Sequence, residues 1–288
     1  MTRSPRVASG RSHADVEARQ PRRLDPRPPI LAIAIAAIAV AFFALPFLGL
    51  LWRVPWTAAW GIVTETDSLN ALRLSIECSV LAALLSVVLG VPLAWVLARI
   101  EFPGRRIVRA LCLLSLVLPP VVAGVALFSA YGRRGLLGGP VADWFGVHLP
   151  YSTAGVVIAQ TFVAMPFLVL TVEAALRGLD RGSEEAARTL GAGSWYTFRR
   201  VTIPAIRPAL VAGTVLAWAR ALGEFGATVT FAGNLPGTTQ TAPLAVYRAL
   251  EADPDQALVL SVVLIGISFS VLIGLRDRWL APTSAHHR

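Results

Sequence analysis

Glu185-Ala-Ala-Arg-Thr-Leu-Gly191, followed after nine residues by Val201-Thr-Ile-Pro204, is a polar, arginine-rich interruption between two strongly apolar stretches. Its small residues and its glycine occur at spacings that suit a short helix ending in a tight turn. We expect an element of this kind, held at both ends by apolar stretches, to present a surface that another protein grips. Its amphipathic character alone is equally compatible with a connector that lies on a bilayer surface.

The residues around this interruption predict two short helices. Ser183 is expected to cap the first helix, whose first turn carries Glu184 and Glu185 where negative charge meets the positive end of the helix dipole. Gly191 is expected to end that helix, because glycine adopts the left-handed conformation of a helix terminus. Ser194 can start the second helix. The residues predicted to share one narrow face of the first helix are Ala186, Ala187 and Leu190.

The composition indicates a membrane protein. Of 288 residues, 55% are hydrophobic and 15% are charged, against about 25% charged in soluble domains. The apolar residues fall into six blocks of roughly 20 residues or more, enough to cross a bilayer as helices. These blocks are residues 30–51, 74–98, 107–131, 153–176, 209–232 and 257–275. The sequence therefore predicts an all-α polytopic membrane protein with six transmembrane helices.

Arginine placement predicts the orientation of these spans. Arginines are concentrated before the first span and in the second and fourth connections, and cytoplasmic segments carry such an excess. Both termini are therefore expected in the cytoplasm. The predicted organisation is a disordered Arg/Pro-rich tail over 1–29, a membrane domain over 30–275 containing the cytoplasmic segment 177–208, and a short tail over 276–288.

Several chemistries are not indicated. Cys78 and Cys112 lie inside apolar runs without a CxxC spacing, so they are interpreted as buried apolar residues. The sequence has no phosphate-binding GxxxxGK[ST] loop and no HExxH motif. We predict no catalytic residue, no metal and no cofactor. The net charge of +9 is spread over particular loops, which argues against nucleic acid as a partner.

The full spacing of the opening segment, E-A-A-x3-G-x9-[I/V]-x-[L/I]-P, resembles the cytoplasmic signature of binding-protein-dependent ABC importer permeases. The positions that match it are Glu185, Ala186, Ala187, Gly191, Val201, Ile203 and Pro204. The resemblance implies the type I importer permease fold and a coupling segment that docks on a separate ATP-hydrolysing subunit. It also implies close packing at Ala186, Ala187 and Gly191, and a polar contact from Glu185 to that subunit.

Two blocks further along the chain resemble the molybdate permeases. They are R-x-L-G-E-F-G-A-T-x-T-F over 220–231 and N-x-P-G-x-T-x-T-x-P-L-x-x-Y over 234–247. Sulfate permeases share part of the first block, so sulfate and tungstate remain alternative substrates. The resemblance implies a homodimeric permease in a bacterial inner membrane. The implied partners are a pair of ATPase subunits, an extracytoplasmic oxyanion-binding protein, a second copy of the chain and the lipid bilayer.

Arg220 and Glu224 are predicted to lie near the bilayer midplane. A charge there costs at least about 2.5 kcal/mol, so Arg220 should face the protein interior with a partner. Glu224 is one helical turn away and can pair with it. The pair could only fix helix packing, or Arg220 could line the path of an oxyanion. In the second case Thr214, Thr228 and Thr230 are candidate milder contacts.

An ion-coupled secondary transporter is the alternative from another class. Such a protein would need repeated halves and intramembrane carboxylates for its coupling ions. The sequence shows no repeat, and Glu224 is its one carboxylate placed deep inside a predicted span. The pattern therefore favours the importer permease.

Overall fold

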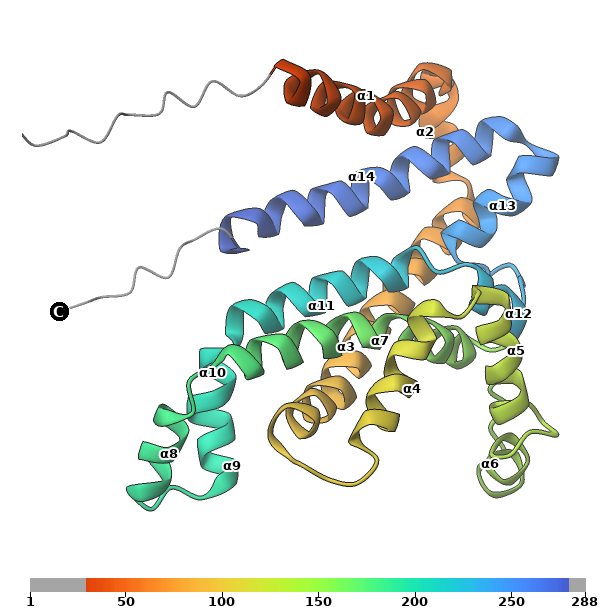
Figure 1. The fold of residues 1–288 in the computed structure, drawn as a ribbon. Helices are drawn as coiled ribbons and strands as arrows, with labels where there is room; N and C mark the ends of the chain where they lie inside the picture. The colour runs from red at the N-terminus through yellow and green to blue at the C-terminus, as the bar shows by residue number, and fades with distance from the viewer. Residues whose placement is uncertain (1–29, 280–288) are drawn as a thin grey trace, which may run out of the picture. The chain divides into compact units, whose positions relative to one another are not determined.

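The computed structural model describes residues 30–279, whose regular secondary structure is entirely helical (Figure 1). This confirms the all-α class. The chain divides into two units, residues 1–49 and 50–288. The predictions made for the tail over 1–29 and for residues 280–288 lie outside the described residues. The last helix continues to Trp279, a few residues beyond the predicted end of the membrane domain.

Helix α1 (Ile30–Arg53) coincides with the first predicted span. It is apolar along its length and has no buried residue. Pro46 lies inside the helix without ending it. All-round hydrophobicity without burial against protein is the pattern of a helix whose side chains contact lipid.

Three helices form the core of residues 50–279: α3 (Thr66–Arg99), α7 (Thr153–Gly178) and α11 (Arg207–Leu222). Small buried residues recur every four positions along α3, so they form a stripe that lets backbones approach closely. They are Cys78, Ala82, Ser86, Gly90 and Ala94. A methyl group on Gly90 would lie 2.8 Å from Leu168 Cδ2 of α7. The small residues of this stripe therefore let the backbones of α3 and α7 approach closely.

The third predicted span, 107–131, is not one helix. It consists of α4 (Arg105–Val117) and α5 (Pro120–Tyr131), separated by an extended break at Leu118 and Pro119. Two consecutive prolines remove two backbone N–H donors, and each one drives the residue before it into an extended conformation. The sequence prediction of a continuous helix here is wrong for this reason.

The fifth predicted span, 209–232, is also interrupted. Helix α11 ends at Leu222, and a separate α12 (Gly226–Ala232) follows after three residues. Glu224 lies in this break, and its carboxylate accepts a hydrogen bond from the Ala227 N–H at 2.8 Å. A side-chain acceptor of this kind satisfies the first turn of a new helix, which stabilises the break.

The remaining helices are shorter, apart from the last. They are α2 (Trp56–Thr64), α6 (Gly138–Phe145), α8 (Gly182–Thr189), α9 (Ser194–Thr197), the π-helical turn η1 (Phe198–Thr202), α10 (Ile203–Ala205), α13 (Ala242–Ala252) and α14 (Pro254–Trp279). Four helices among residues 30–279 are long and apolar enough to cross a membrane, namely α1, α3, α7 and the Pro254–Gly274 part of α14. A fifth arises if the bent pair Ser194–Ala205 and Arg207–Leu222 counts as one span.

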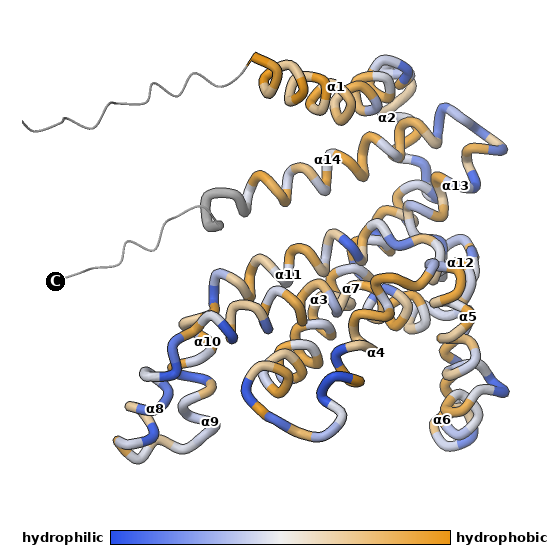
Figure 2. Tube along the Cα trace, in the orientation of Figure 1, coloured by the Kyte–Doolittle hydropathy of each residue, from blue (hydrophilic) through white to orange (hydrophobic). Residues whose placement is uncertain are grey.

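Hydropathy marks one end of this core. Figure 2 shows hydrophobic residues along the long helices, whereas hydrophilic residues gather around α8 to α10 and in the loop that leads into α4. These two hydrophilic regions contain the arginine-rich connections recognised in the sequence. The candidate coupling segment therefore lies at a polar end of the helical core.

Candidate functional site

The candidate coupling segment, residues 177–208, folds around α8 and α9. Helix α8 ends in a left-handed turn, with Gly191 at φ +86°. The Gly191 N–H donates to the Arg188 carbonyl at 2.9 Å, and the Ala192 N–H donates to the Ala187 carbonyl at 3.0 Å. This pair of bonds is the Schellman arrangement, in which glycine is preferred. The predicted stop at Gly191 is confirmed, as is the start of the second helix at Ser194.

The predicted cap at Ser183 is wrong. Helix α8 begins one residue earlier, at Gly182, and no side chain caps it from the preceding position. Instead, Asp180 accepts a hydrogen bond from the Gly182 N–H at 3.1 Å. A short turn closed by an aspartate therefore leads into the helix, and this is a common use of that residue.

The segment presents a largely exposed face. Glu185 and Ala186 are exposed, and Ala187 is half-buried. Three large apolar side chains are also exposed in the turn and in α9, namely Leu190 (88%), Trp195 (72%) and Tyr196 (59%). Large exposed apolar groups on a polar segment mark a surface that binds another protein or a membrane.

Glu184 points the other way, which the sequence did not reveal. It is buried, and its Oε1 accepts a bond from Arg99 Nη2 at 3.2 Å and another from Thr202 Oγ1 at 2.8 Å. Adjacent residues on a helix face directions about 100° apart, so Glu184 can turn inward while Glu185 faces out. The doublet in the sequence contains no signal that tells which one does.

The second arm of the segment bends sharply into the membrane helix. The run Ser194–Ala205 meets Arg207–Leu222 at 76°. Pro204 is exposed and occupies the first turn of α10 next to this bend. Phe198 of the same arm stacks on Trp195 and packs edge-on against Trp95 of α3, with ring centroids 5.8 Å apart.

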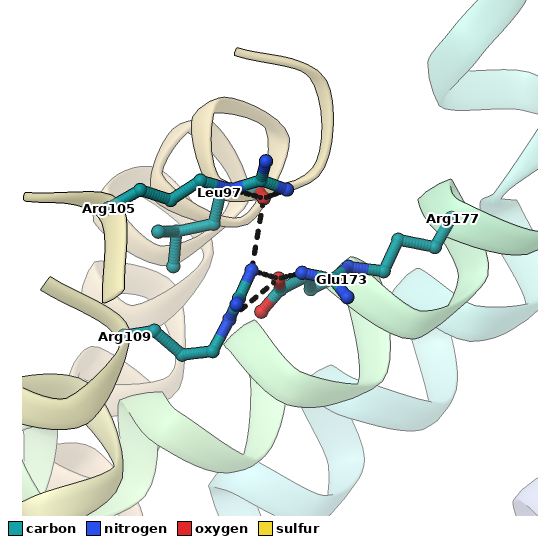
Figure 3. Close-up of polar contacts among 5 residues, drawn as sticks. All are labelled: Leu97, Arg105, Arg109, Glu173 and Arg177. Atoms are coloured by element: carbon teal, nitrogen blue, oxygen red, sulfur yellow. Dashed lines mark hydrogen bonds and ion pairs between the residues drawn. The ribbon is translucent and has the colours of Figure 1, made fainter. Parts of the chain in front are cut away.

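An ionic cluster joins α3, α4 and α7 near this end (Figure 3). Arg109 of α4 donates to Glu173 Oε1 of α7 from Nε at 3.1 Å and from Nη2 at 2.5 Å. Arg177 donates to the same oxygen at 2.7 Å. The Leu97 carbonyl, near the end of α3, accepts from Arg105 Nε at 2.9 Å and from Arg109 Nη2 at 3.3 Å. The pairing of Glu173 with Arg177 follows from their spacing, but the contact with Arg109 joins residues that are far apart in the sequence.

Arg220 and Glu224 pair as expected. Arg220 Nη1 lies 2.6 Å from Glu224 Oε2, and the Glu224 side chain is only 1% exposed. Because Glu224 Oε1 also accepts from Ala227, the carboxylate holds both an arginine and the first turn of α12. The Arg220 side chain is 29% exposed.

Arg220 also lines a cavity of about 300 Å³. The other lining residues are 115–120, Ala123, Val163 and Phe167. The cavity thus opens at the proline break between α4 and α5. A volume of this size has room for a small anion and several waters, each of which takes about 30 Å³ in the liquid.

The three candidate threonines differ in what their hydroxyls do. Thr214 donates to the Leu210 carbonyl, and Thr230 donates to the Gly226 carbonyl. Thr228 is fully buried, and its hydroxyl has no hydrogen-bond partner among the described residues. Of the three hydroxyl protons, only that of Thr228 is uncommitted in this conformation.

Residues 86–284 match the family model of the binding-protein-dependent transport system inner membrane component. The chain belongs to this family. It is 44% identical over 247 residues to the molybdenum transport system permease protein ModB of Mycobacterium tuberculosis (strain ATCC 25618 / H37Rv), covering 85% of this chain and 93% of that protein. ModB of Escherichia coli (strain K12) is 42% identical over 215 residues, covering 75% of this chain and 94% of that protein.

Two further comparisons concern a sulfate permease and a solved structure. The sulfate transport system permease protein CysT of Escherichia coli (strain K12) is 35% identical over 224 residues, covering 77% of this chain and 80% of that protein. A chain in the crystal structure of a bacterial ABC transporter involved in the import of alginate aligns with a TM-score of 0.71 at 16% identity. That alignment covers 88% of this chain and 96% of the other. The fold is thus shared with a solved ABC importer.

In this family member, two glycines bring α12 against α5. A methyl group on Gly226 would lie 2.5 Å from Pro120 Cβ, and one on Gly124 would lie 2.5 Å from Thr230 Cβ. Neither neighbour is the end of a flexible side chain. The break in the fifth predicted span is therefore seated directly on the break in the third.

Gly226→Ala is expected to lower the apparent free energy of unfolding by about 2 kcal/mol, because the added methyl overpacks a rigid contact. Denaturant titration in detergent micelles measures this change. Gly266→Ala is the matched control, since Gly266 lies in α14 with open space around it. That control should be neutral or slightly stabilising, because alanine favours a helix over glycine. Equal effects of the two substitutions would contradict the close seating of α12 on α5.

Proposed function

We propose that this chain is the membrane permease subunit of an ATP-driven importer of molybdate. Two copies form the pore, a pair of separate ATPase subunits binds the coupling segments, and an extracytoplasmic binding protein delivers the anion. The observation that carries this proposal is the glycine-terminated coupling segment, whose Glu185, Ala186 and Leu190 are exposed at a polar end of the core. Its surface suits a protein partner better than water, because large apolar groups are unfavourable when fully hydrated.

The membrane topology that fits this proposal has six crossings. The third crossing runs through α4 and α5, and the fifth runs through α11 and α12. Non-helical backbone at membrane depth is tolerated where it is buried in protein or lines a cavity. The break at Leu118 and Pro119 lines the cavity beside Arg220, which satisfies this condition. With six crossings and the arginine distribution, both termini lie in the cytoplasm, which reporter fusions at each end would test.

The same cavity is the proposed anion path. Arg220 supplies positive charge, and its pairing with Glu224 moderates that charge so that a dianion is not held too tightly. Thr228 and Thr230 are not among the residues that line this cavity, so either hydroxyl would reach an oxyanion only after the helices around it move. Thr228 would then have its hydroxyl proton free to donate, whereas Thr230 would first have to rotate its hydroxyl away from the Gly226 carbonyl. The molybdenum transport relatives, at 42–44% identity against 35% for the sulfate relative, support molybdate over sulfate as the cargo, and tungstate is the remaining alternative.

Co-purification of the ATPase tests the coupling segment. Glu185→Gln is expected to weaken capture of the ATPase subunit by roughly tenfold, because a hydrogen bond to a charged group is lost. Gly191→Val should weaken capture similarly, since a β-branched residue is strained at φ +86°. Gly191→Asn is the control, because asparagine tolerates this conformation. Undiminished capture by both Glu185→Gln and Gly191→Val would refute the docking role.

Uptake into proteoliposomes tests the cargo. The complex of this chain, the ATPase and the binding protein is expected to accumulate molybdate only with ATP inside. Competition with sulfate and with tungstate ranks the three anions by their apparent affinity for the complex. Accumulation driven by an ion gradient without ATP would instead support a secondary transporter.

A further inference from the structure

The coupling segment is attached to α3 at two points, although α3 precedes it by many residues in the sequence. Glu184 of α8 pairs with Arg99, and Phe198 of the other arm packs against Trp95. Trp95 and Arg99 are four residues apart, so they lie on one face of α3, one helical turn from each other. The last turns of α3 therefore hold both arms of the segment.

The ionic attachment is almost completely shielded from water. The side chains of Arg99 and Glu184 are each 8% exposed, and Thr202 adds a hydrogen bond to the same carboxylate oxygen. Among the hydrogen bonds and ion pairs of residues 30–274, Arg99–Glu184 is the one that joins α8 to a membrane helix. A buried pair is weakly screened by salt, so it resists displacement more than a surface pair does.

The end of α3 is in turn fixed to its neighbours. The Leu97 carbonyl has no partner within the helix, because α3 ends at Arg99. Arg105 and Arg109 of α4 donate to it, and Arg109 also binds Glu173 of α7 (Figure 3). A displacement of Arg99 would therefore act on α4 and α7 as well as on α3.

The opposite end of α3 contacts the other side of the core. Ser75 accepts a hydrogen bond from the Ala242 N–H at 2.6 Å, at the start of α13. Ser68 accepts one from Gln256 Nε2 of α14 at 3.2 Å. The 34 residues of α3 span about 50 Å at 1.5 Å per residue. One continuous helix therefore connects the coupling segment with the connection that carries α13, which the proposed topology places outside the cytoplasm.

We infer that Glu184 is a positioning residue that transmits displacement of the coupling segment to α3 through Arg99, so that α3 carries the movement across the membrane. The covalent neighbours α7 and α11 are then not the sole route. Packed elements and salt-bridge networks that move as units transmit motion in this way. This inference rests on the proposed function, because it presumes an ATPase that moves the segment.

The test separates coupling from assembly. The complex with the ATPase and the binding protein is reconstituted in nanodiscs, and ATP hydrolysis is measured with and without sodium molybdate and the binding protein. Glu184→Gln and Arg99→Gln are expected to retain the bound ATPase and its basal hydrolysis. They should lower the stimulation of ATP hydrolysis by molybdate and the binding protein by about fivefold or more. The charge swap R99E/E184R is expected to restore most of the stimulation, which a loss of local packing would not allow.

Two further variants make the result decisive. The double variant R99Q/E184Q leaves no unpaired buried charge, so it should assemble even if a single variant does not. Full stimulation of this double variant would overturn the inference. Glu77→Gln on the same helix is the matched control, because its pair with Arg73 is exposed, and it should leave stimulation unchanged. Absence of stimulation in the unsubstituted complex would instead count against the proposed function itself.

Discussion

Glu224→Ala is expected to lower the apparent free energy of unfolding by about 4 kcal/mol, the largest loss we predict for a single substitution. The Glu224 side chain is 1% exposed, and its loss leaves Arg220 without its carboxylate inside the core. It also removes the acceptor of the Ala227 N–H at the first turn of α12. Denaturant titration of the purified protein in detergent micelles measures the change.

Glu224→Gln separates the two roles of this carboxylate. The amide oxygen can still accept from Ala227, but the negative charge is gone. We therefore expect Glu224→Gln to cost somewhat less than Glu224→Ala, with the difference reporting the hydrogen bond. Equal stability of Glu224→Ala and the unsubstituted protein would show that the pair contributes nothing.

The double variant R220Q/E224Q then distinguishes packing from transport. It removes both charges, so it should recover at least part of the lost stability. If Arg220 lines the anion path, ATP-driven molybdate uptake stays about tenfold or more below that of the unsubstituted complex, a loss of about 1.4 kcal/mol in the transport barrier. Normal uptake by the double variant would show that the pair only fixes helix packing.

Glu173→Gln is expected to lower the apparent free energy of unfolding by about 3 kcal/mol. Glu173 is buried and accepts from both Arg109 and Arg177, so its neutralisation leaves two arginines without a counter-charge. The cost is smaller than for Glu224→Ala because glutamine keeps an acceptor oxygen for the arginines and because Arg177 is 48% exposed. The same titration measures it.

The control for Glu173 is a pair of the same spacing at the surface. Arg73 and Glu77 also lie at i and i+4, but their side chains are 77% and 50% exposed. Exposed pairs contribute little, so Glu77→Gln should leave the unfolding transition unchanged. A loss as large at Glu77 as at Glu173 would show that spacing, and not burial, sets the effect.

Predictions that depend on local sequence held well. The stop at Gly191 was predicted because a left-handed turn favours glycine, and it is confirmed by φ +86°. The pair of Arg220 with Glu224 was predicted from one turn of helical spacing, and the two groups lie 2.6 Å apart. Both features are set by residues within a few positions of each other.

Three predictions about where helices begin or continue were wrong. Pro119 and Pro120 break the third span, and Glu224 supports a break in the fifth, although both stretches are apolar enough to pass as single helices. Ser183 does not cap α8, because the chain enters that helix through a turn closed by Asp180. In the two spans, local backbone chemistry outweighed the hydrophobic pattern, and at α8 the Asp180 turn took the place of the expected serine cap.

By itself the sequence determined the membrane class, the helical architecture, the family and the segment that is exposed for a partner to bind. It could do so because hydropathy, arginine placement and a fixed motif spacing are local properties. Only the tertiary structure decided that Glu184 turns inward to Arg99, that Arg109 meets Glu173, and that Arg220 borders a cavity at the proline break. These contacts join residues whose separation in the chain contains no periodic signal, so they exist only once the helices have packed.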